Sequence, residues 1–141
     1  MLCNLFLASA LVLSLSSARA DDKDSLDGTW LAASAEIAGN KFPDEIRKTI
    51  KLVIKDDKYT VTVGKEAKDE GTVKRNPSAT PKTMDISGTD GPNKGKTFLA
   101  IYEHKGDTLR VCYDLSGKKH PTEFKTAAGT QLFLVEYQKQ K

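Results

Sequence analysis

Apolar and polar residues alternate along most of the chain, in short segments that are separated by turn-forming residues. In residues 50–55 and again in residues 59–63 every second side chain is apolar, and a polar tripeptide, residues 56–58, lies between the two segments. Alternation with a period of two predicts β-strands that bury one face, and the tripeptide predicts the turn of a hairpin. The same reasoning predicts strands over residues 28–37, 50–55, 59–63, 71–75, 83–87, 98–103, 109–114 and 131–138.

The connections between these strands are short, and no ten-residue helical pattern separates them. Parallel strands need long crossover connections, so the sequence predicts an all-β fold in which consecutive strands pair antiparallel. About eight strands at regular spacing favour an eight-stranded up-and-down antiparallel barrel. One short helix is expected after the first strand, around residues 42–48, because Pro43 suits the first helical position and Asp44 and Glu45 suit the first turn.

The side chains expected inside the barrel are mostly bulky. Because strands of about six residues make a short barrel, a bulky lining favours a core that is mostly filled, with at most a shallow cavity at one end. In the first strand, counting from Trp30 places Glu36 inside as well, whereas a β-bulge would reverse its side. The residues expected inside are Trp30, Ile50, Leu52, Ile54, Tyr59, Val61, Val63, Met84, Ile86, Leu99, Ile101, Leu109, Val111, Tyr113, Leu132 and Leu134.

The first twenty residues have the pattern of a signal peptide. Residues 2–15 are almost wholly apolar and a small-x-small cleavage site ends at Ala20, although no lysine or arginine precedes the apolar run. Cleavage after Ala20 predicts a secreted or periplasmic protein with a polar leader, residues 21–25, and one barrel domain, residues 26–141. We expect no stable membrane insertion after cleavage, because the apolar run is too short to span a bilayer.

Charge and cysteine content narrow the function classes. The chain has 22 lysines and arginines against 19 acidic residues, a net charge of +3, which falls to +2 when Arg19 leaves with the signal peptide. A balance this close to neutral gives no support for nucleic-acid binding. Cleavage also removes Cys3, so Cys112 becomes the single thiol. No disulfide can then form within the mature chain, while one between two chains stays open.

No residue pattern in the sequence indicates catalysis, a metal or a cofactor. The two histidines, His104 and His120, both lie beside turns and lysines, where a solvated side chain is the ordinary outcome. Cys112 has no recognisable Cys-His motif near it, which favours a half-buried strand residue over a nucleophile. The loop of residues 90–96 contains glycines and lysines but lacks the phosphate-loop pattern, which favours a tight connection over an anion site. We therefore expect that the protein is not an enzyme.

Four side chains are candidates for a ligand site at the mouth of the barrel. Tyr59, Tyr102 and Tyr113 have rings that suit a surface with one apolar and one wet side, although packing within the core is the simpler explanation. Glu36 would fix the polar end of a ligand, or a cation, if it points inward, and is a solvated side chain if the barrel ends before it.

The first strand carries Gly28-x-Trp30. This motif resembles the signature of lipocalins and other calycins, in which the tryptophan closes one end of the barrel beside a basic residue of the last strand. The resemblance implies that role for Trp30, with Lys139 as the nearest basic candidate. The chain is also similar to an uncharacterised lipocalin-like family expanded in planctomycete bacteria, which implies a lipocalin-like fold and no activity. The segments that carry this similarity are 26–30, 43–45, 81–86, 89–97, 101–103, 106–109, 112–113 and 121–124.

Two functions fit these expectations. The first is an extracytoplasmic lipocalin-like binding module that holds a small, partly apolar or amphipathic ligand at the barrel mouth. The alternative is a barrel with a filled core that acts on an envelope or secreted protein, as an inhibitor or a scaffold. The volume of the interior separates the two, because a continuous cavity of about 300 Å³ or more favours a ligand and a filled interior favours a protein partner.

Overall fold

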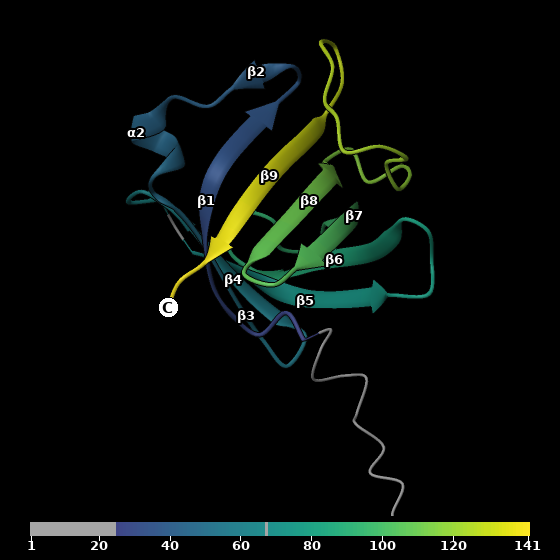
Figure 1. The fold of residues 1–141 in the computed structure, drawn as a ribbon, viewed down its shortest axis with the longest axis horizontal. Coiled ribbons are helices and arrows are strands. Elements are labelled where there is room, and N and C mark those ends of the chain that lie inside the picture. Colours follow the sequence, from purple (N-terminus) through teal and green to yellow (C-terminus); the bar gives the residue numbers. More distant parts are fainter. Residues whose placement is uncertain (1–24, 67) are drawn as a thin grey trace, which may run out of the picture.

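The structure, a computed structural model, describes residues 25–66 and 68–141, so the predicted signal peptide and all but the last residue of the predicted leader lie outside the described residues. These residues form strands and one short helix (Figure 1). The elements in chain order are β1 (Gly28–Ile37), β2 (Asn40–Lys41), α2 (Asp44–Arg47), β3 (Ile50–Lys55), β4 (Lys58–Val63), β5 (Asp69–Asn76), β6 (Lys82–Asp90), β7 (Thr97–Lys105), β8 (Thr108–Asp114) and β9 (Leu132–Lys139).

The strands close into an antiparallel barrel. From β3 to β9 each strand pairs with the next along the chain, and β1 pairs with β3 on one side and with β9 on the other. The two-residue strand β2 only extends the far end of β1, and α2 follows it directly. The fold class predicted from the sequence, an eight-stranded up-and-down antiparallel barrel with one short helix after the first strand, is confirmed.

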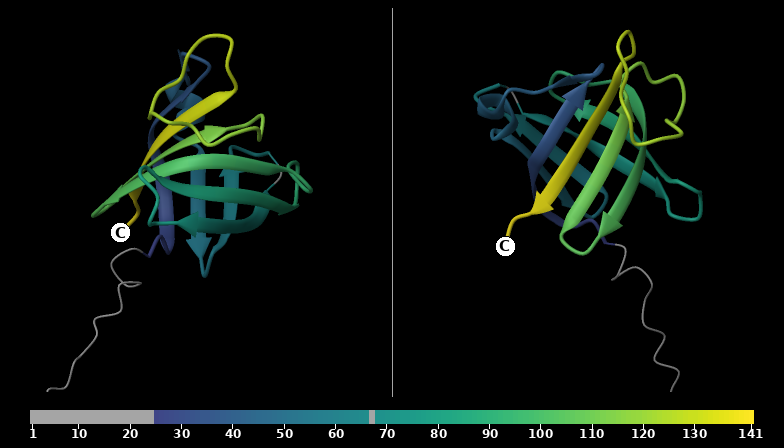
Figure 2. Two further views of the ribbon diagram at one scale, coloured as in Figure 1. Left: turned by 90° about the vertical axis from the view of Figure 1, so that its right-hand side faces the viewer. Right: turned by 45° about the horizontal axis from the view of Figure 1, so that its top comes forward.

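The two ends of the barrel carry different connections (Figures 1 and 2). One end holds the start of β1, the end of β9 and short hairpin turns such as residues 56–57 and 106–107. The other end holds the β2–α2 segment and the long connection between β8 and β9, residues 115–131 (Figure 2). We call these the tryptophan end and the loop end.

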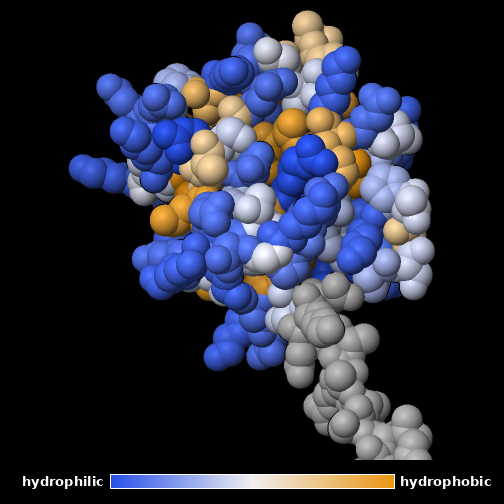
Figure 3. All heavy atoms as spheres, viewed as in Figure 1, coloured by the Kyte–Doolittle hydropathy of each residue, from blue (hydrophilic) through white to orange (hydrophobic). Residues whose placement is uncertain are grey.

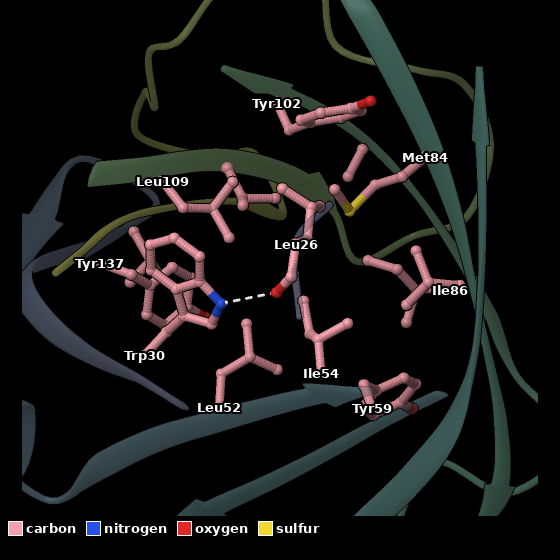
Figure 4. Packing of buried hydrophobic residues seen from close by; sticks show 14 of the residues in the cluster. Leu26, Trp30, Leu52, Ile54, Tyr59, Met84, Ile86, Tyr102, Leu109 and Tyr137 are labelled. Carbon is pink, nitrogen blue, oxygen red and sulfur yellow. Dashed lines mark hydrogen bonds between the residues drawn. The ribbon is translucent and has the colours of Figure 1, made fainter. Parts of the chain in front are cut away.

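The tryptophan end is packed. Trp30 is completely buried, and its indole Nε1 donates a hydrogen bond to the carbonyl oxygen of Leu26, 2.9 Å away (Figure 4). The Leu26 side chain, 1% exposed, belongs to the same buried cluster as Trp30 (Figure 4). The Lys139 ammonium lies 5.8 Å from the centre of the Trp30 ring, and the His104 ring meets it edge-on at 5.7 Å. Apolar burial of this kind stabilises the fold by roughly 2–3 kcal/mol for each large side chain.

A β-bulge in β1 reverses the side on which its second half points. The pairing with β9 shifts register between Ala32 and Ser34, and beyond the shift Ala35 is the residue that joins the core. The prediction that Glu36 lies inside is therefore wrong, because it assumed an uninterrupted alternation from Trp30. The structure instead has the β-bulge considered in the sequence analysis, which turns Glu36 to the outside.

The sequence also assigned the wrong faces of β7 and β9 to the interior. Leu99, Ile101, Leu132 and Leu134 were expected inside. The core instead takes Ala100 and Tyr102 from β7, and Val135 and Tyr137 from β9.

The reason is that the middle of β7 and the first half of β9 are apolar on both faces. Ile101 and Cys112 pair across β7 and β8 and are both fully buried on the outside of the barrel. The 115–131 connection covers this outer face, because the Cys112 sulfur lies 3.7 Å from the Lys125 carbonyl oxygen and the Arg110 guanidinium lies 4.1 Å from the centre of the Phe124 ring. Figure 3 shows apolar side chains framed by polar ones at the upper ends of these strands.

Candidate functional site

A cavity of about 130 Å³ lies inside the barrel, and its lining reaches the loop end at Phe98, Leu115 and Phe133. The walls are mostly aliphatic and aromatic, and the polar groups among them are few. An apolar pocket with a small number of placed polar groups is the usual form of a small-molecule site. The aliphatic and phenyl walls include Ile54, Val61, Val73, Phe98, Val111 and Phe133, and the polar lining residues are Tyr59, Asp69, Asn93, Tyr113 and Tyr137.

Two tyrosine hydroxyls face each other in this cavity. Tyr113 comes from β8 and Tyr137 from β9, and their oxygens lie 3.1 Å apart. A hydroxyl carries one hydrogen, so the bond between the two uses one hydrogen and leaves the second free to donate. Burial raises the pKa of Tyr113 well above its ordinary value, helped by the neighbouring Tyr137, and burial raises the pKa of Tyr137 to about 12. Both groups therefore stay protonated donors at physiological pH.

A buried carboxylate organises the opposite wall. Asp69, 6% exposed, accepts a hydrogen bond from the Tyr59 hydroxyl at 3.1 Å. It also accepts one from the Asn93 backbone at 3.1 Å and one from the Asn93 amide nitrogen at 2.9 Å. Burial raises the pKa of Tyr59, and the adjacent Asp69 charge raises it further. These contacts fasten the loop after β6 to the start of β5.

Glycines make this close contact possible. A Cβ atom on Gly71 would lie 2.6 Å from the Tyr59 ring and 2.0 Å from the Ser87 carbonyl oxygen. A Cβ atom on Gly91 would lie 2.3 Å from the Lys68 carbonyl oxygen, and the positive φ of Gly91 (+92°) also favours glycine. No local pattern predicts the contact of Asp69 with Asn93, because it joins the start of β5 to the loop after β6, two segments that are distant along the chain.

Three stacked rings mark the mouth of the cavity. Phe42, just before α2, stacks on Phe133 with ring centres 5.5 Å apart, and Phe133 stacks on Tyr113 at the same distance. Both pairs lie 24° from parallel. All three rings are half-buried, so the row leads from the surface of the loop end to the hydroxyl pair inside.

The structure brings two of the four predicted ligand residues together. Tyr59 and Tyr113 line the cavity. Tyr102 is buried, at 2% exposure, but lies outside the cavity wall, and its hydroxyl is the one buried side-chain polar atom that lacks a hydrogen-bond partner within the described part of the chain. Glu36 lies on the outer face, where it accepts a hydrogen bond from the Thr126 hydroxyl. Sequence reasoning missed Tyr137, because it placed the alternate residues of β9 inside.

Glu36 helps to hold the 115–131 connection in place. The Thr126 hydroxyl that donates to Glu36 also accepts a hydrogen bond from the Gly39 backbone at 3.0 Å. Thr126 is 6% exposed, so this contact holds the 115–131 connection against the end of β1.

The histidines and the cysteine lie apart from the cavity. The His104 Nε2 lies 2.9 Å from the Gly106 carbonyl oxygen, and the His120 Nε2 lies 2.7 Å from the Asp85 carboxylate on the barrel exterior. Burial raises the pKa of the Cys112 thiol, which disfavours the reactive thiolate. In the part of the chain that the structure describes, no three His, Cys, Asp or Glu side chains gather closely enough to hold a metal ion.

The glycine-containing loop after β6 uses its amides within the protein. Gly88 N–H donates to the Lys96 carbonyl, Gly95 N–H donates to the Gly88 carbonyl, and Asn93 N–H donates to Asp69. An anion site needs unspent amide donors, so these bonds favour the tight connection expected from the sequence.

Comparison with known proteins yields no match to a family model, to a curated protein or to a solved structure. Among the described residues, no helix has the length and apolar character needed to cross a membrane. The site has to be interpreted from its own geometry.

Proposed function

We propose that the protein is an extracytoplasmic binding module that holds one small, largely apolar molecule in the barrel cavity. The observation that carries the proposal is the apolar cavity of about 130 Å³ with a spare hydroxyl hydrogen on the Tyr113–Tyr137 pair. The signal-peptide pattern of residues 1–20 supports the location outside the cytoplasm. The resemblance of the Gly28-x-Trp30 motif to lipocalins supports a binding role.

The volume sets the size of the ligand. The cavity is smaller than the roughly 300 Å³ that a drug-sized ligand needs. An apolar cavity of about 150 Å³ takes up benzene, so the space here suits at most one six-membered ring. A long acyl chain does not fit this space.

The polar groups set the chemistry of the ligand. The free hydrogen of the Tyr113–Tyr137 pair offers one donor to an ether, carbonyl or hydroxyl oxygen. The Asp69 carboxylate is already occupied by Tyr59 and Asn93. The proposal therefore favours a ring with one accepting oxygen over a cation. It assigns no catalytic step, since the buried Cys112 thiol lies outside the cavity.

A protein partner is the second candidate, and the modest volume of the cavity is the observation that favours it. In that case the barrel would act as an inhibitor or scaffold for a secreted or envelope protein, and the cavity would be a packing gap. The two candidates differ in what the cavity does, so a variant that fills it separates them.

The test compares two valine variants. Val61 lines the cavity, and Val53 lies on the neighbouring strand β3 outside the cavity wall. Binding of phenol, followed by nuclear magnetic resonance titration, should be lost in Val61→Phe and kept in Val53→Phe. Native mass spectrometry of the wild-type protein, purified from its own envelope fraction, should show a bound mass that Val61→Phe lacks. Equal behaviour of the two variants in both measurements would refute the ligand proposal and leave the protein-partner candidate.

A further inference from the structure

A second depression adjoins the mouth of the cavity at the loop end. Phe98 and Leu115 line both the cavity and this depression, so the two spaces share a wall. The polar side chains of the depression are Lys96, Lys118, Ser116, Gln131 and Thr97. A ligand whose ring occupies the cavity would extend past Phe98 and Leu115 toward two ammonium groups.

The chain conformation places both lysines on the wall of this depression. Gly117 has a φ of +70°, and a Cβ atom there would lie 2.5 Å from the Thr97 carbonyl oxygen. This approach lays the turn after β8 directly on the start of β7. Lys118 follows the glycine and Lys96 precedes Thr97, so the contact brings together lysines of two loops that are distant along the chain.

Within the described chain, the Asp114 carboxylate at the end of β8 forms no ion pair with either lysine. The Asp114 carboxylate is 6% exposed and accepts bonds from the Ser116 backbone at 2.9 Å, the Ser116 hydroxyl at 2.5 Å and the Lys119 backbone at 3.1 Å. These bonds hold the pKa of Asp114 below its usual value against the opposing effect of its burial. Within residues 25–66 and 68–141, Lys96 and Lys118 make no ion pair.

We propose that the natural ligand is a small amphipathic anion, a single ring joined by a short linker to a carboxylate, with the acid held between Lys96 and Lys118. This inference rests on the proposed binding function and names the class of its ligand. The ring takes the apolar cavity, and the acid stays at the rim, where its hydration is not lost. No Asp or Glu side chain among the described residues lines the depression, so the carboxylate of the ligand would supply the negative charge that faces the two lysines.

The experiment measures the dissociation constants of two matched probes, 3-phenylpropanoate and the neutral 3-phenylpropanamide. Exposed ion pairs are each weak, so two lysines should favour the carboxylate by roughly tenfold over the amide. The double variant Lys96→Gln with Lys118→Gln should reduce this preference to about twofold or less, since both charges at the rim are gone. Added salt should weaken the binding of the carboxylate and leave the binding of the amide unchanged.

The control is the double variant Lys94→Gln with Lys119→Gln. It removes the same charge from the same two loops, but neither lysine lines the depression. The carboxylate preference should persist in it at roughly the wild-type value. An equal loss in both double variants would mean that general charge, and not the rim pair, attracts the anion, and the inference would be overturned.

The remaining outcomes separate this inference from the function on which it rests. If the amide and the carboxylate bind wild-type protein equally and Val61→Phe abolishes both, the cavity function stands and the anion inference fails. If the carboxylate binds equally well to Val61→Phe, the lysines bind a surface anion only, and both proposals fail. If neither probe binds the wild type, the cavity function fails and the inference falls with it.

Discussion

The two ends of the barrel are built from the same strands, yet one is packed and the other is hollow. At the tryptophan end, Trp30 and Leu26 fill the space between the strands and bond to each other. At the loop end, tyrosines and valines surround a cavity of about 130 Å³. Trp30 of β1 and Leu26 in the segment before it account for the packed end.

Dense packing and free space are therefore separated within one barrel. Close packing gives low free energy, because each buried group contacts others on all sides, whereas a cavity forfeits those contacts. The polar hydrogen bonds of the loop end, Tyr113 with Tyr137 and Tyr59 with Asp69, fix the walls of the cavity without filling it. The predictions below test this separation.

The largest effect is expected at the packed end. Trp30→Ala removes a completely buried side chain and leaves a void beneath Leu26, so it should lower the free energy of unfolding by about 3–5 kcal/mol. Leu31→Ala is the control, because Leu31 is the next residue on the strand and is 38% exposed. Urea unfolding followed by fluorescence or circular dichroism measures both. A loss below about 1 kcal/mol for Trp30→Ala would contradict the assignment of the core to this end.

An alkaline titration should weaken the hollow end selectively. The pKa of Tyr137 is about 12 in the folded chain, against the usual 10.0 of a tyrosine in the unfolded chain, so the folded form holds the proton more tightly. This contribution, about 3 kcal/mol, is present in full below pH 10 and is lost as the pH rises through about 12. Unfolding measured between pH 8 and 12 should show a shallower decline in Tyr137→Phe than in the wild type. Equal slopes would show that this hydroxyl is not buried as described.

The smallest effect should come from adding one methylene group to one of two valines that pair across β8 and β9. Val111 and Val135 lie opposite each other on β8 and β9, and only Val111 lines the cavity. Val111→Ile should change the free energy of unfolding by less than about 1 kcal/mol, because the added group enters free space. Val135→Ile overfills a site with no exposed surface and should cost about 1–3 kcal/mol. Thermal unfolding of the two variants compares them, and equal costs would mean that the loop end is packed as densely as the rest.

Strand positions were predictable from the sequence because alternation is a local property. The hairpin formed by β3 and β4 shows this, since Leu52 and Ile54 face the core as expected. In β7 and β9 the alternation carried no information, because the outer positions are apolar as well and are covered by the 115–131 connection. The bulge in β1 is a register shift set by the pairing with β9, which the segment itself does not reveal.

The candidate site was predictable only in part for the same reason. Tyr59 and Tyr113 could be selected because tyrosine suits a wet apolar surface. Tyr137 was not predicted, because the wrong face of β9 was assigned to the interior. Asp69 and Asn93 were not predicted either, because a contact between the start of β5 and a distant loop leaves no periodic signal. The cavity itself depends on small differences in side-chain volume, which a pattern of apolar and polar positions does not encode.

The pairing of β1 with β9 has a consequence for the order of events during folding. Trp30 pairs with Lys139, so β1 gains its second neighbour only when β9 joins the sheet. Until then β1 and β8 each present an unpaired edge that neighbouring chains can extend. The partly folded chain is therefore most prone to association before β9 pairs, and closure of the barrel removes both edges.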